Sequence, residues 1–191
     1  MLRSGDAVFE RRIDDEVTLA LLEEQHAPEL FRLLDANRAY LRRWLPWLDA
    51  NTKPEHTAAF IQVGLRRFAA RDGLACGIRF RGALAGVVGL HHIEWANRRT
   101  GLGYWIAEAH QGKGIVTRAC AGLVDYAFGE LGLNHVEIAC APGNPRSCAI
   151  PERLGFVREA VLRQREWLYD HFVDHAVYGM LASEWAARTP R

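Results

Sequence analysis

The chain has 191 residues, of which 49% are apolar and 25% are charged. This length and composition are those of a globular protein with one sizeable core, or at most two small ones. The formal net charge is only +1, so no strongly basic field points to nucleic acid as a partner.

No run of residues is long and apolar enough to cross a membrane, and the N-terminal segment lacks the apolar centre of a secretory signal. The chain has four cysteines, and they form no CxxC pair and have no zinc-like spacing. They are Cys76, Cys120, Cys140 and Cys148. We therefore expect reduced thiols, no bound metal and a cytoplasmic location.

The first part of the chain alternates between one strand and two helices. The apolar pattern predicts a strand over Val17–Leu22 and then a helix that begins at Pro28 and continues to position 44. Pro46 interrupts this helix, and a second one is predicted from Pro54 to about Arg71.

From position 74 onward, short apolar runs replace the helical pattern. Two predicted strands, Ala75–Phe80 and Leu84–His92, are joined by a hairpin turn at Arg81-Gly82, and Thr100–Ala107 is a third strand. The later elements are a helix over 114–131, a strand over 135–140, a helix over 145–154, and strands over 156–168 and 172–181.

This order places antiparallel strands early and a strand–helix–strand unit at the centre of the chain. We therefore predict an α+β fold, in which one mixed, mostly antiparallel central sheet is flanked by helices. Without internal repeats or a linker, residues 1–191 are expected to form a single domain with its core at about 17–182.

The most informative segment is the turn Gln111-Gly112-Lys113-Gly114, which joins the end of a strand to the start of a helix. The first turn of a helix exposes backbone N–H groups and the positive end of the helix dipole. Glycines beside it let a phosphate approach the main chain, because no Cβ stands in the way. The segment therefore predicts a pyrophosphate-binding turn.

Other phosphate-binding motifs match this turn less well. The P-loop pattern GxxxxGK[ST] is absent, since Lys113 lies between the two glycines and Thr117 follows four residues later. The dinucleotide pattern GxGxxG would need a glycine where Thr117 stands. A glycine-rich connection that binds nothing is the structural alternative.

The run Gln111-Gly112-Lys113-Gly114-Ile115-Val116 resembles the Q/R-x-x-G-x-G/A element of the GNAT superfamily of N-acetyltransferases. The resemblance implies that this turn and the following Thr117 hold the pyrophosphate arm of CoA. It also implies that the preceding strand end, Trp105-Ile106-Ala107, pairs with the pantetheine arm and contacts the thioester carbonyl. Val116 departs from the pattern, because a small residue is usual there.

A second segment begins at Asn144, a good N-cap, and its helix is expected to end near Gly155. By itself it is only a well-capped helix. It also resembles the second CoA-side motif of GNAT enzymes, N-x-x-A/S-x-x-x-Y-x-x-x-G-F, with Asn144, Ser147, Gly155 and Phe156 at the right spacing. Pro151 stands where many members carry the tyrosine proposed to protonate the leaving thiolate.

Ser147 and Pro151 are four residues apart and therefore lie on the same face of the helix. Ser147 is the best candidate for the hydrogen-bond donor to the CoA sulfur. Pro151 lacks an N–H, so it leaves the carbonyl of Ser147 without its helical partner. The alternative is a serine that is simply buried in the first helical turn.

Serine followed by proline at these positions resembles the Rim-type (RimJ/RimL-like) branch, which acetylates protein N-termini. The segments Tyr40–Trp47 and Glu166-Trp167-Leu168 also resemble that branch. The resemblance implies acetyl-CoA as cosubstrate, direct attack in a ternary complex, and Glu166 as the base. Analogy with the branch also suggests a homodimer.

The acceptor side is less well defined. Glu166 could instead be a surface glutamate paired with a neighbouring arginine, and Glu94 is the next candidate for the base, together with His92. Trp44, Trp47 and Trp167 are expected to line the acceptor side, although such aromatic residues often belong to a core.

The nature of the amine stays open at this point. An N-terminal amine, with a pKa near ~8, is already partly neutral in the cytoplasm, whereas a lysine near ~10.4 is not. A protein N-terminus of the ribosomal serine or alanine type is therefore the preferred acceptor. The alternatives are a small amine, such as a polyamine, amino acid or antibiotic, and a CoA-binding sensor domain without turnover.

Overall fold

The computed structural model describes residues 9–188. Its strands are Glu10–Arg12 (β1), Val17–Leu21 (β2), Leu74–Phe80 (β3), Ala83–Glu94 (β4), Arg99–Ile106 (β5), His135–Cys140 (β6), Val157–Leu168 (β7) and His171–Leu181 (β8). Its α-helices are Ala27–Ala36 (α1), Arg38–Leu41 (α2), Pro54–Ala69 (α3), Ile115–Gly129 (α4), Pro145–Arg153 (α5) and Ala182–Ala186 (α6). Short 3₁₀ turns cover Glu24–His26, Leu48–Ala50 and Glu108–His110.

The strands form one eight-stranded sheet in the order β1-β2-β3-β4-β5-β6-β8-β7. Every neighbouring pair is antiparallel except β5 and β6, which run parallel and are connected through α4. A parallel pair requires such a crossover connection. The predicted α+β fold with one mixed, mostly antiparallel sheet is therefore confirmed.

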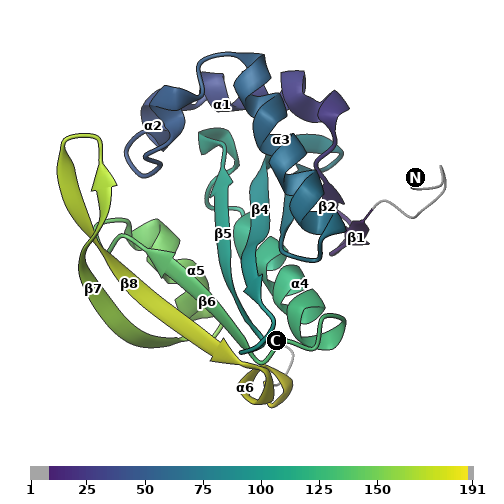
Figure 1. Ribbon diagram of the computed structural model, residues 1–191, viewed down its shortest axis with the longest axis vertical. Coiled ribbons are helices and arrows are strands. Elements are labelled where there is room, and N and C mark those ends of the chain that lie inside the picture. The colour runs from purple at the N-terminus through teal and green to yellow at the C-terminus, as the bar shows by residue number, and fades with distance from the viewer. Residues whose placement is uncertain (1–8, 189–191) are drawn as a thin grey trace.

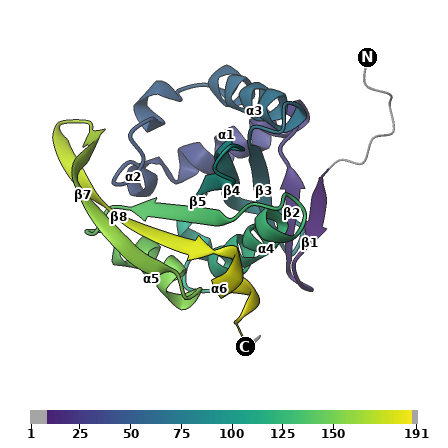
Figure 2. The same ribbon diagram turned by 60° about the horizontal axis from the view of Figure 1, so that its bottom comes forward.

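Helices cover both faces of this sheet. Helices α1 and α3 lie on one face, and α4 and α5 lie on the other (Figure 2). Alternation along β5 explains this, because Leu102 packs into the core that contains Leu123 of α4, whereas Trp105 packs against Leu30 and Ile61 of α1 and α3.

The sheet is split between its two parallel strands. Pairing of β5 with β6 is confined to Arg99↔His135, Thr100↔Val136 and Gly101↔Glu137. Beyond Gly101 the strands diverge, which gives the molecule the open V visible in Figure 1. Between Leu102 and Ile106, the edge of β5 that faces β6 has no strand partner in the described part of the chain.

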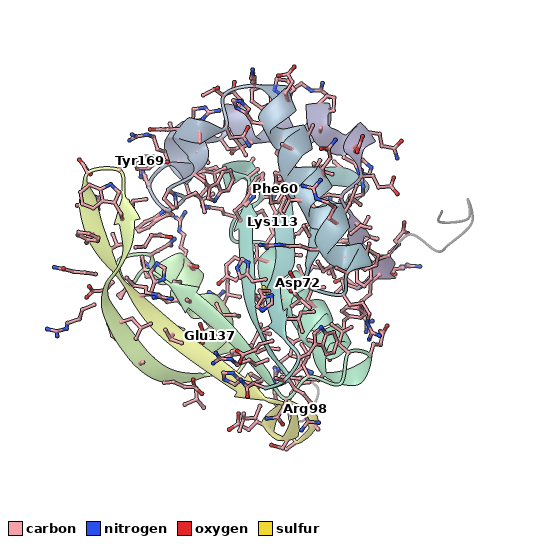
Figure 3. All side chains as sticks on the ribbon, viewed as in Figure 1. Phe60, Asp72, Arg98, Lys113, Glu137 and Tyr169 are labelled. Carbon is pink, nitrogen blue, oxygen red and sulfur yellow. The ribbon has the colours of Figure 1, made fainter. Side chains whose placement is uncertain are left out.

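The tip of the β7–β8 hairpin is tied to the segment that follows α2. The hydroxyl of Tyr169 donates to the carbonyl of Leu45 at 2.6 Å, and the guanidinium of Arg42 lies 3.8 Å from the centre of the Tyr169 ring. Figure 3 places Tyr169 at this tip, beside the α2 region. The hairpin tip and the segment after α2 therefore flank one end of the split.

Most predicted elements are confirmed, and the differences have local causes. The helix predicted from Pro28 to position 44 is broken at Asn37, whose side chain donates to the carbonyl of Leu33 at 2.8 Å and accepts from the N–H of Glu108 at 2.9 Å. This side chain competes with the helical hydrogen bonds. Strand β1 and helix α6 were not predicted, because three and five residues are too few for a periodic pattern.

Within residues 9–188, none of the helices has the length and apolar character that a membrane crossing requires.

Candidate active site

The turn before α4 has the backbone of an anion-binding site. Gly112 and Gly114 both adopt left-handed conformations, with φ of 73° and 68°. Gly114 is the N-cap of α4, so the free N–H groups of the first helical turn begin directly after it. A Cβ built on either glycine would meet no atom within 4 Å, so the space over the turn is open to a ligand. The predicted phosphate-binding geometry is therefore present in the structure.

A cavity of about 830 Å³ lies beside this turn. Its lining includes His110 and three arginines, Arg118, Arg146 and Arg153, and none of the lining residues in the described part of the chain is an aspartate or glutamate. Arg118 is itself paired with Asp14 and Glu16 outside the pocket. Helix dipole, glycine backbone and arginines together favour a multiply charged anion. The residues present therefore fit the pyrophosphate of CoA, and we name this cavity the CoA-side pocket.

Most residues predicted from the sequence to bind the cofactor line this pocket. They are Trp105, Ile106, Gln111, Gly112, Gly114, Ile115, Val116, Thr117, Asn144 and Ser147. Two others do not line it. The ammonium of Lys113 lies 5.7 Å from the centre of the Phe80 ring, and Ala107 is buried with its N–H bonded to the carbonyl of Ala85.

Val116, the departure from the family pattern, is 8% exposed and packs in the main core. Most of its bulk is therefore accommodated in the core, although the residue also lines the CoA-side pocket.

Gln111 connects three elements around the pocket. Its amide nitrogen donates to the hydroxyl of Tyr40 on α2, and its amide oxygen accepts from the guanidinium of Arg146 on α5. Burial raises the pKa of Tyr40, so this phenol stays protonated at neutral pH. Sequence reasoning gave Arg146 no role, since only the fold brings α5 next to the turn.

Ser147 sits at the start of α5, where its N–H donates to the Asn144 side chain at 3.2 Å. Its hydroxyl donates to the hydroxyl of Tyr104 at 3.3 Å. Tyr104 in turn donates to the main-chain carbonyl of Ser147 at 3.0 Å. This is the carbonyl that Pro151 leaves without a helical partner, so a side chain from β5 replaces the missing amide.

Sequence reasoning missed Tyr104, although the carbonyl freed by Pro151 was a signal that a donor must lie nearby. Burial raises the pKa of the Tyr104 phenol far above its usual range, with Ser147 opposing this weakly. The phenol therefore remains a hydrogen-bond donor at all physiological pH values.

A second cavity, of about 800 Å³, lies partly between α3 and the β7–β8 hairpin, and we name it the acceptor cleft. It shares six lining residues with the CoA-side pocket: Trp44, Leu45, Tyr104, Trp105, Asn144 and Ser147. The two cavities therefore meet at Ser147, beside the split between β5 and β6.

The acceptor cleft differs from the CoA-side pocket in charge. It contains the carboxylates of Glu137 and Glu166, and Arg67 on α3 is its one arginine among the described lining residues. Figure 3 shows Glu137 on β6, on the side of the V opposite Phe60 of α3. Carboxylates among aromatic side chains suit a cationic or neutral amine.

Three histidines also line the cleft: His56, His91 and His175. The ring of His91 lies over two glycines of β5, because a Cβ at Gly101 or Gly103 would come within 3.1 or 2.6 Å of it. Burial lowers the pKa of His91, and the nearby Arg67 lowers it further. His91 is therefore a neutral imidazole at pH 7.

Three of the predicted acceptor-side residues lie in the cleft: Trp44, Trp47 and Glu166. Glu94 does not, since its carboxylate accepts from Arg99 at 2.5 Å and from Asn97 at the far end of the β4–β5 hairpin. The structure therefore does not bring Glu94 together with Ser147.

Two further aromatic or basic candidates also lie elsewhere. Trp167 is 52% exposed at the hairpin tip, where its ring packs edge-on against Phe172 at 4.8 Å and lines neither cavity. His92 is paired with Asp72 on the surface. Neither side chain is placed to contact an amine at Ser147.

The sulfur atoms of Cys140 and Cys148 lie 3.3 Å apart as free thiols near the meeting point of the two cavities. Burial raises the pKa of Cys140 to about 12, so a nucleophilic thiolate is disfavoured there. Among residues 9–188, no group of three His, Cys, Asp or Glu side chains could hold a metal ion.

Comparison with known proteins agrees with this geometry. Residues 16–157 match the model of the acetyltransferase (GNAT) domain family. The chain is 36% identical over 181 residues to YdaF of Bacillus subtilis (strain 168), named as a candidate ribosomal N-acetyltransferase, with 93% of this chain and 98% of YdaF covered.

Two solved structures have closely similar folds. The microcin C7 self-immunity acetyltransferase MccE, in complex with acetyl-CoA and AMP, matches with a TM-score of 0.85 and 29% identity over 88% of this chain and 94% of MccE. RimL, the ribosomal L7/L12 α-N-protein acetyltransferase in complex with coenzyme A, matches with a TM-score of 0.87 and 25% identity over 91% of this chain and 98% of RimL. The chain therefore belongs to the GNAT acetyltransferase family and is an acetyl-CoA-dependent N-acetyltransferase.

Proposed function

We propose that the enzyme acetylates a protein N-terminal amine, of the ribosomal serine or alanine type, by direct transfer within a ternary complex. The observation that carries this proposal is the meeting of two cavities of opposite character at Ser147. One is basic and built on a helix N-terminus, and the other contains two carboxylates and opens partly between α3 and the β7–β8 hairpin.

On the CoA side, the main-chain N–H groups after Gly112 and Gly114 and the guanidinium of Arg146 would hold the pyrophosphate. The unpaired edge of β5 between Leu102 and Ile106 would pair with the amide groups of the pantetheine arm. Acetyl-CoA, when bound, supplies an acetyl group activated as a thioester.

Ser147 is then the donor to the departing sulfur. Its backbone N–H donates to the Asn144 side chain, which anchors the residue at the start of α5, and its hydroxyl donates to Tyr104. The serine hydroxyl has one proton, which it donates to the Tyr104 oxygen in this structure, so the hydroxyl must turn from Tyr104 to the sulfur when acetyl-CoA is bound. The bond from the Tyr104 phenol to the Ser147 carbonyl keeps the residue in place between the two cavities.

Glu166 is the proposed base. Its carboxylate lines the acceptor cleft and its side chain is 31% exposed, so it is accessible to an amine but partly shielded from bulk water. An N-terminal amine needs only a small shift toward its neutral form at pH 7, so one carboxylate suffices to remove its proton.

The size of the acceptor cleft is compatible with a polypeptide acceptor. Its wall runs from Trp47 and Phe60 across β4 and β5 to Leu168 and His175 near the hairpin. A cavity of about 800 Å³ has room for an extended chain end, and the same volume also suits a small molecule, so the acceptor panels decide between the two classes. The names of YdaF and RimL support a ribosomal acceptor for those proteins, and this chain resembles both.

The test is thiol release from acetyl-CoA against two acceptor panels, one of peptides with N-terminal serine or alanine and one of polyamines, amino acids and amino-nucleotides. Binding of acetyl-CoA is measured beside it by calorimetry. We expect the wild-type enzyme to turn over the peptides. Turnover should be lost in Ser147→Ala and retained in Ser183→Ala, a control at an exposed position.

If only the small amines are turned over, the acceptor is a small molecule and not a protein N-terminus. Acetyl-CoA binding without turnover on either panel would instead mark a CoA-sensing domain.

Two further parts of the proposal stand on analogy with the Rim-type branch: action in the cytoplasm and assembly as a homodimer. Light scattering after size exclusion tests the second. A species of twice the chain mass of 21.5 kDa is expected, and a species of 21.5 kDa would exclude it.

A further inference from the structure

Glu166 has a neighbour in the acceptor cleft that the proposed function does not use. Its Oε2 atom lies 3.5 Å from Nε2 of His175, on the adjacent strand. The histidine side chain is only 18% exposed, and both residues line the cleft. A carboxylate and an imidazole thus line the acceptor cleft side by side.

A local irregularity in the hairpin creates this contact. Leu162 pairs with His175, and an uninterrupted antiparallel register would then place Glu166 opposite His171. Instead, β7 bulges and Glu166 pairs with Val173. Residues two apart on one strand point to the same face, so Glu166 becomes the diagonal neighbour of His175.

The bulge is held by a specific hydrogen bond. Gln164, a non-glycine residue, adopts a left-handed conformation with φ of 51°. Its N–H donates to the carboxylate of Asp174 at 2.8 Å. Since strained backbone persists only where its surroundings hold it, the Asp174 side chain fixes the register that aims Glu166 at His175.

We propose that Glu166 and His175 act as a proton-accepting pair, in which His175 holds the carboxylate in place and receives the proton that Glu166 takes from the amine. The inference rests on the proposed function, in which Glu166 is the base.

The proton transfers balance. The N–H bond of the acceptor ammonium breaks as an O–H bond forms on Glu166, and the amine becomes neutral. That O–H bond then breaks as an N–H bond forms on Nε2 of His175, which restores the carboxylate. Nε2 must therefore be unprotonated beforehand, with the ring proton on Nδ1.

Other charged and titratable groups line the same cleft. They are Glu137 and Cys140 from β6, Tyr104 from β5, His91 from β4, and His56 and Arg67 from α3. The pH test must therefore separate His175 from His91 and His56, the other imidazoles of the cleft. The sheet offers a matched control, because His135 and Glu159 form a pair of the same 3.5 Å length that lines neither cavity.

The experiment is the pH profile of kcat/KM from pH 5 to 9, with whichever acceptor of the two panels is turned over fastest. The variants are His175→Ala, His175→Gln, His91→Gln, His56→Gln and the control His135→Gln. We expect kcat/KM of His175→Ala to fall by about tenfold or more.

Glutamine can orient the carboxylate but cannot take its proton. In His175→Gln the acidic limb is therefore expected to move to lower pH, toward the range of a carboxylate alone. His135→Gln should match the wild type.

A second measurement needs no acceptor and no catalysis. Histidine ring chemical shifts are recorded by NMR at one pH in the wild type and in Glu166→Gln. The Glu166 carboxylate lies 3.5 Å from Nε2 of His175, so its removal should change the ring chemical shifts of that histidine. The ring chemical shifts of His135 in the same spectra should stay unchanged.

Three outcomes would overturn the pair. The first is that the ring chemical shifts of His175 do not respond to Glu166→Gln, whatever the acceptor proves to be. The second is an unchanged pH profile in His175→Gln. The third is movement of the acidic limb only in His91→Gln or His56→Gln. If neither acceptor panel is turned over, the proposed function fails, while the NMR spectra still decide whether the two side chains interact.

Discussion

Pro151 and Tyr104 show how a single substitution in a family pattern is compensated by another residue. Proline removes the amide that would bond to the Ser147 carbonyl, and the Tyr104 phenol supplies the missing donor from a different strand. The same phenol accepts from the Ser147 hydroxyl. A hydroxyl group therefore remains where the two cavities meet, although the tyrosine of the family pattern is absent from α5.

Ser147→Ala removes the proposed donor to the leaving sulfur. We expect kcat to fall at least about tenfold, with acetyl-CoA affinity changed by less than about twofold, because the hydroxyl acts on the departing thiolate. Steady-state kinetics and calorimetry check this. An unchanged kcat would show that Ser147 only caps and fills the first turn of α5.

Tyr104→Phe tests the compensation itself. The substitution leaves a buried carbonyl without its donor, so the free energy of unfolding should drop by about 1–2 kcal/mol. Tyr178→Phe is a matched control, since its hydroxyl donates to Glu152 on the outer part of α5 rather than to Ser147. Urea unfolding measures both, and kcat should fall only in Tyr104→Phe.

At the scale of elements, the turn before α4 is predicted to bind acetyl-CoA through its glycine backbone. Alanine at Gly114, where φ is 68°, adds left-handed strain of about 1 kcal/mol and places a methyl group in the open space over the turn. Acetyl-CoA binding should weaken at least about tenfold, which calorimetry measures.

Gly82→Ala is the control for this strain. Gly82 also has a left-handed φ, of 84°, and an added Cβ there would meet nothing within 4 Å, but it lies in the β3–β4 hairpin. It should lower the thermal midpoint by a similar amount and leave acetyl-CoA affinity intact. Equal affinity losses in both variants would mean that strain alone, not contact with phosphate, explains the result.

The elements with strong periodicity or clear turn chemistry could be predicted from the sequence. The Arg81-Gly82 hairpin is an example, as both residues have positive φ in the structure. The break at Asn37 could not be predicted, because it depends on a hydrogen bond to Glu108, 71 residues away. Local patterns carry no information on such contacts.

The candidate site divides in the same way. The CoA-side turn and Ser147 belong to local motifs, and their positions follow from the motifs' spacing. Tyr104, Arg146 and His175 enter the site only through the packing of separate strands and helices, so their roles were not visible in the sequence. Glu94 has a carboxylate and Trp167 an aromatic ring, as an acceptor site would need, but the fold places both side chains away from Ser147.

At the scale of the whole molecule, Asp14 links the first hairpin to α4. Burial opposes its ionisation, but the N–H groups of Glu16 and Val17 and the guanidinium of Arg118, 2.6 Å away, prevail and lower its pKa. A carboxyl group with a lowered folded-state pKa stabilises the protein above its unfolded pKa and loses that effect as the pH falls.

Asp14→Asn should therefore lower the free energy of unfolding at pH 7, and its difference from the wild type should vanish as the pH falls below 3.8. Denaturant titrations at several pH values measure this. Asp15→Asn is the control, because that side chain is 94% exposed and its ion pair within residues 9–188 is with the neighbouring, exposed Arg12. A difference that persists at low pH would assign the effect to packing rather than to charge.

The meeting of a basic pocket and an acidic cleft at Ser147 implies that both substrates are bound together when the acetyl group moves. The most direct test is the initial velocity measured over a grid of acetyl-CoA and acceptor concentrations. Double-reciprocal lines that intersect are the expected result, and Cys140→Ala should leave that pattern in place. Parallel lines, with an acetyl group trapped on Cys140, would contradict direct transfer and show that the protein is acetylated first.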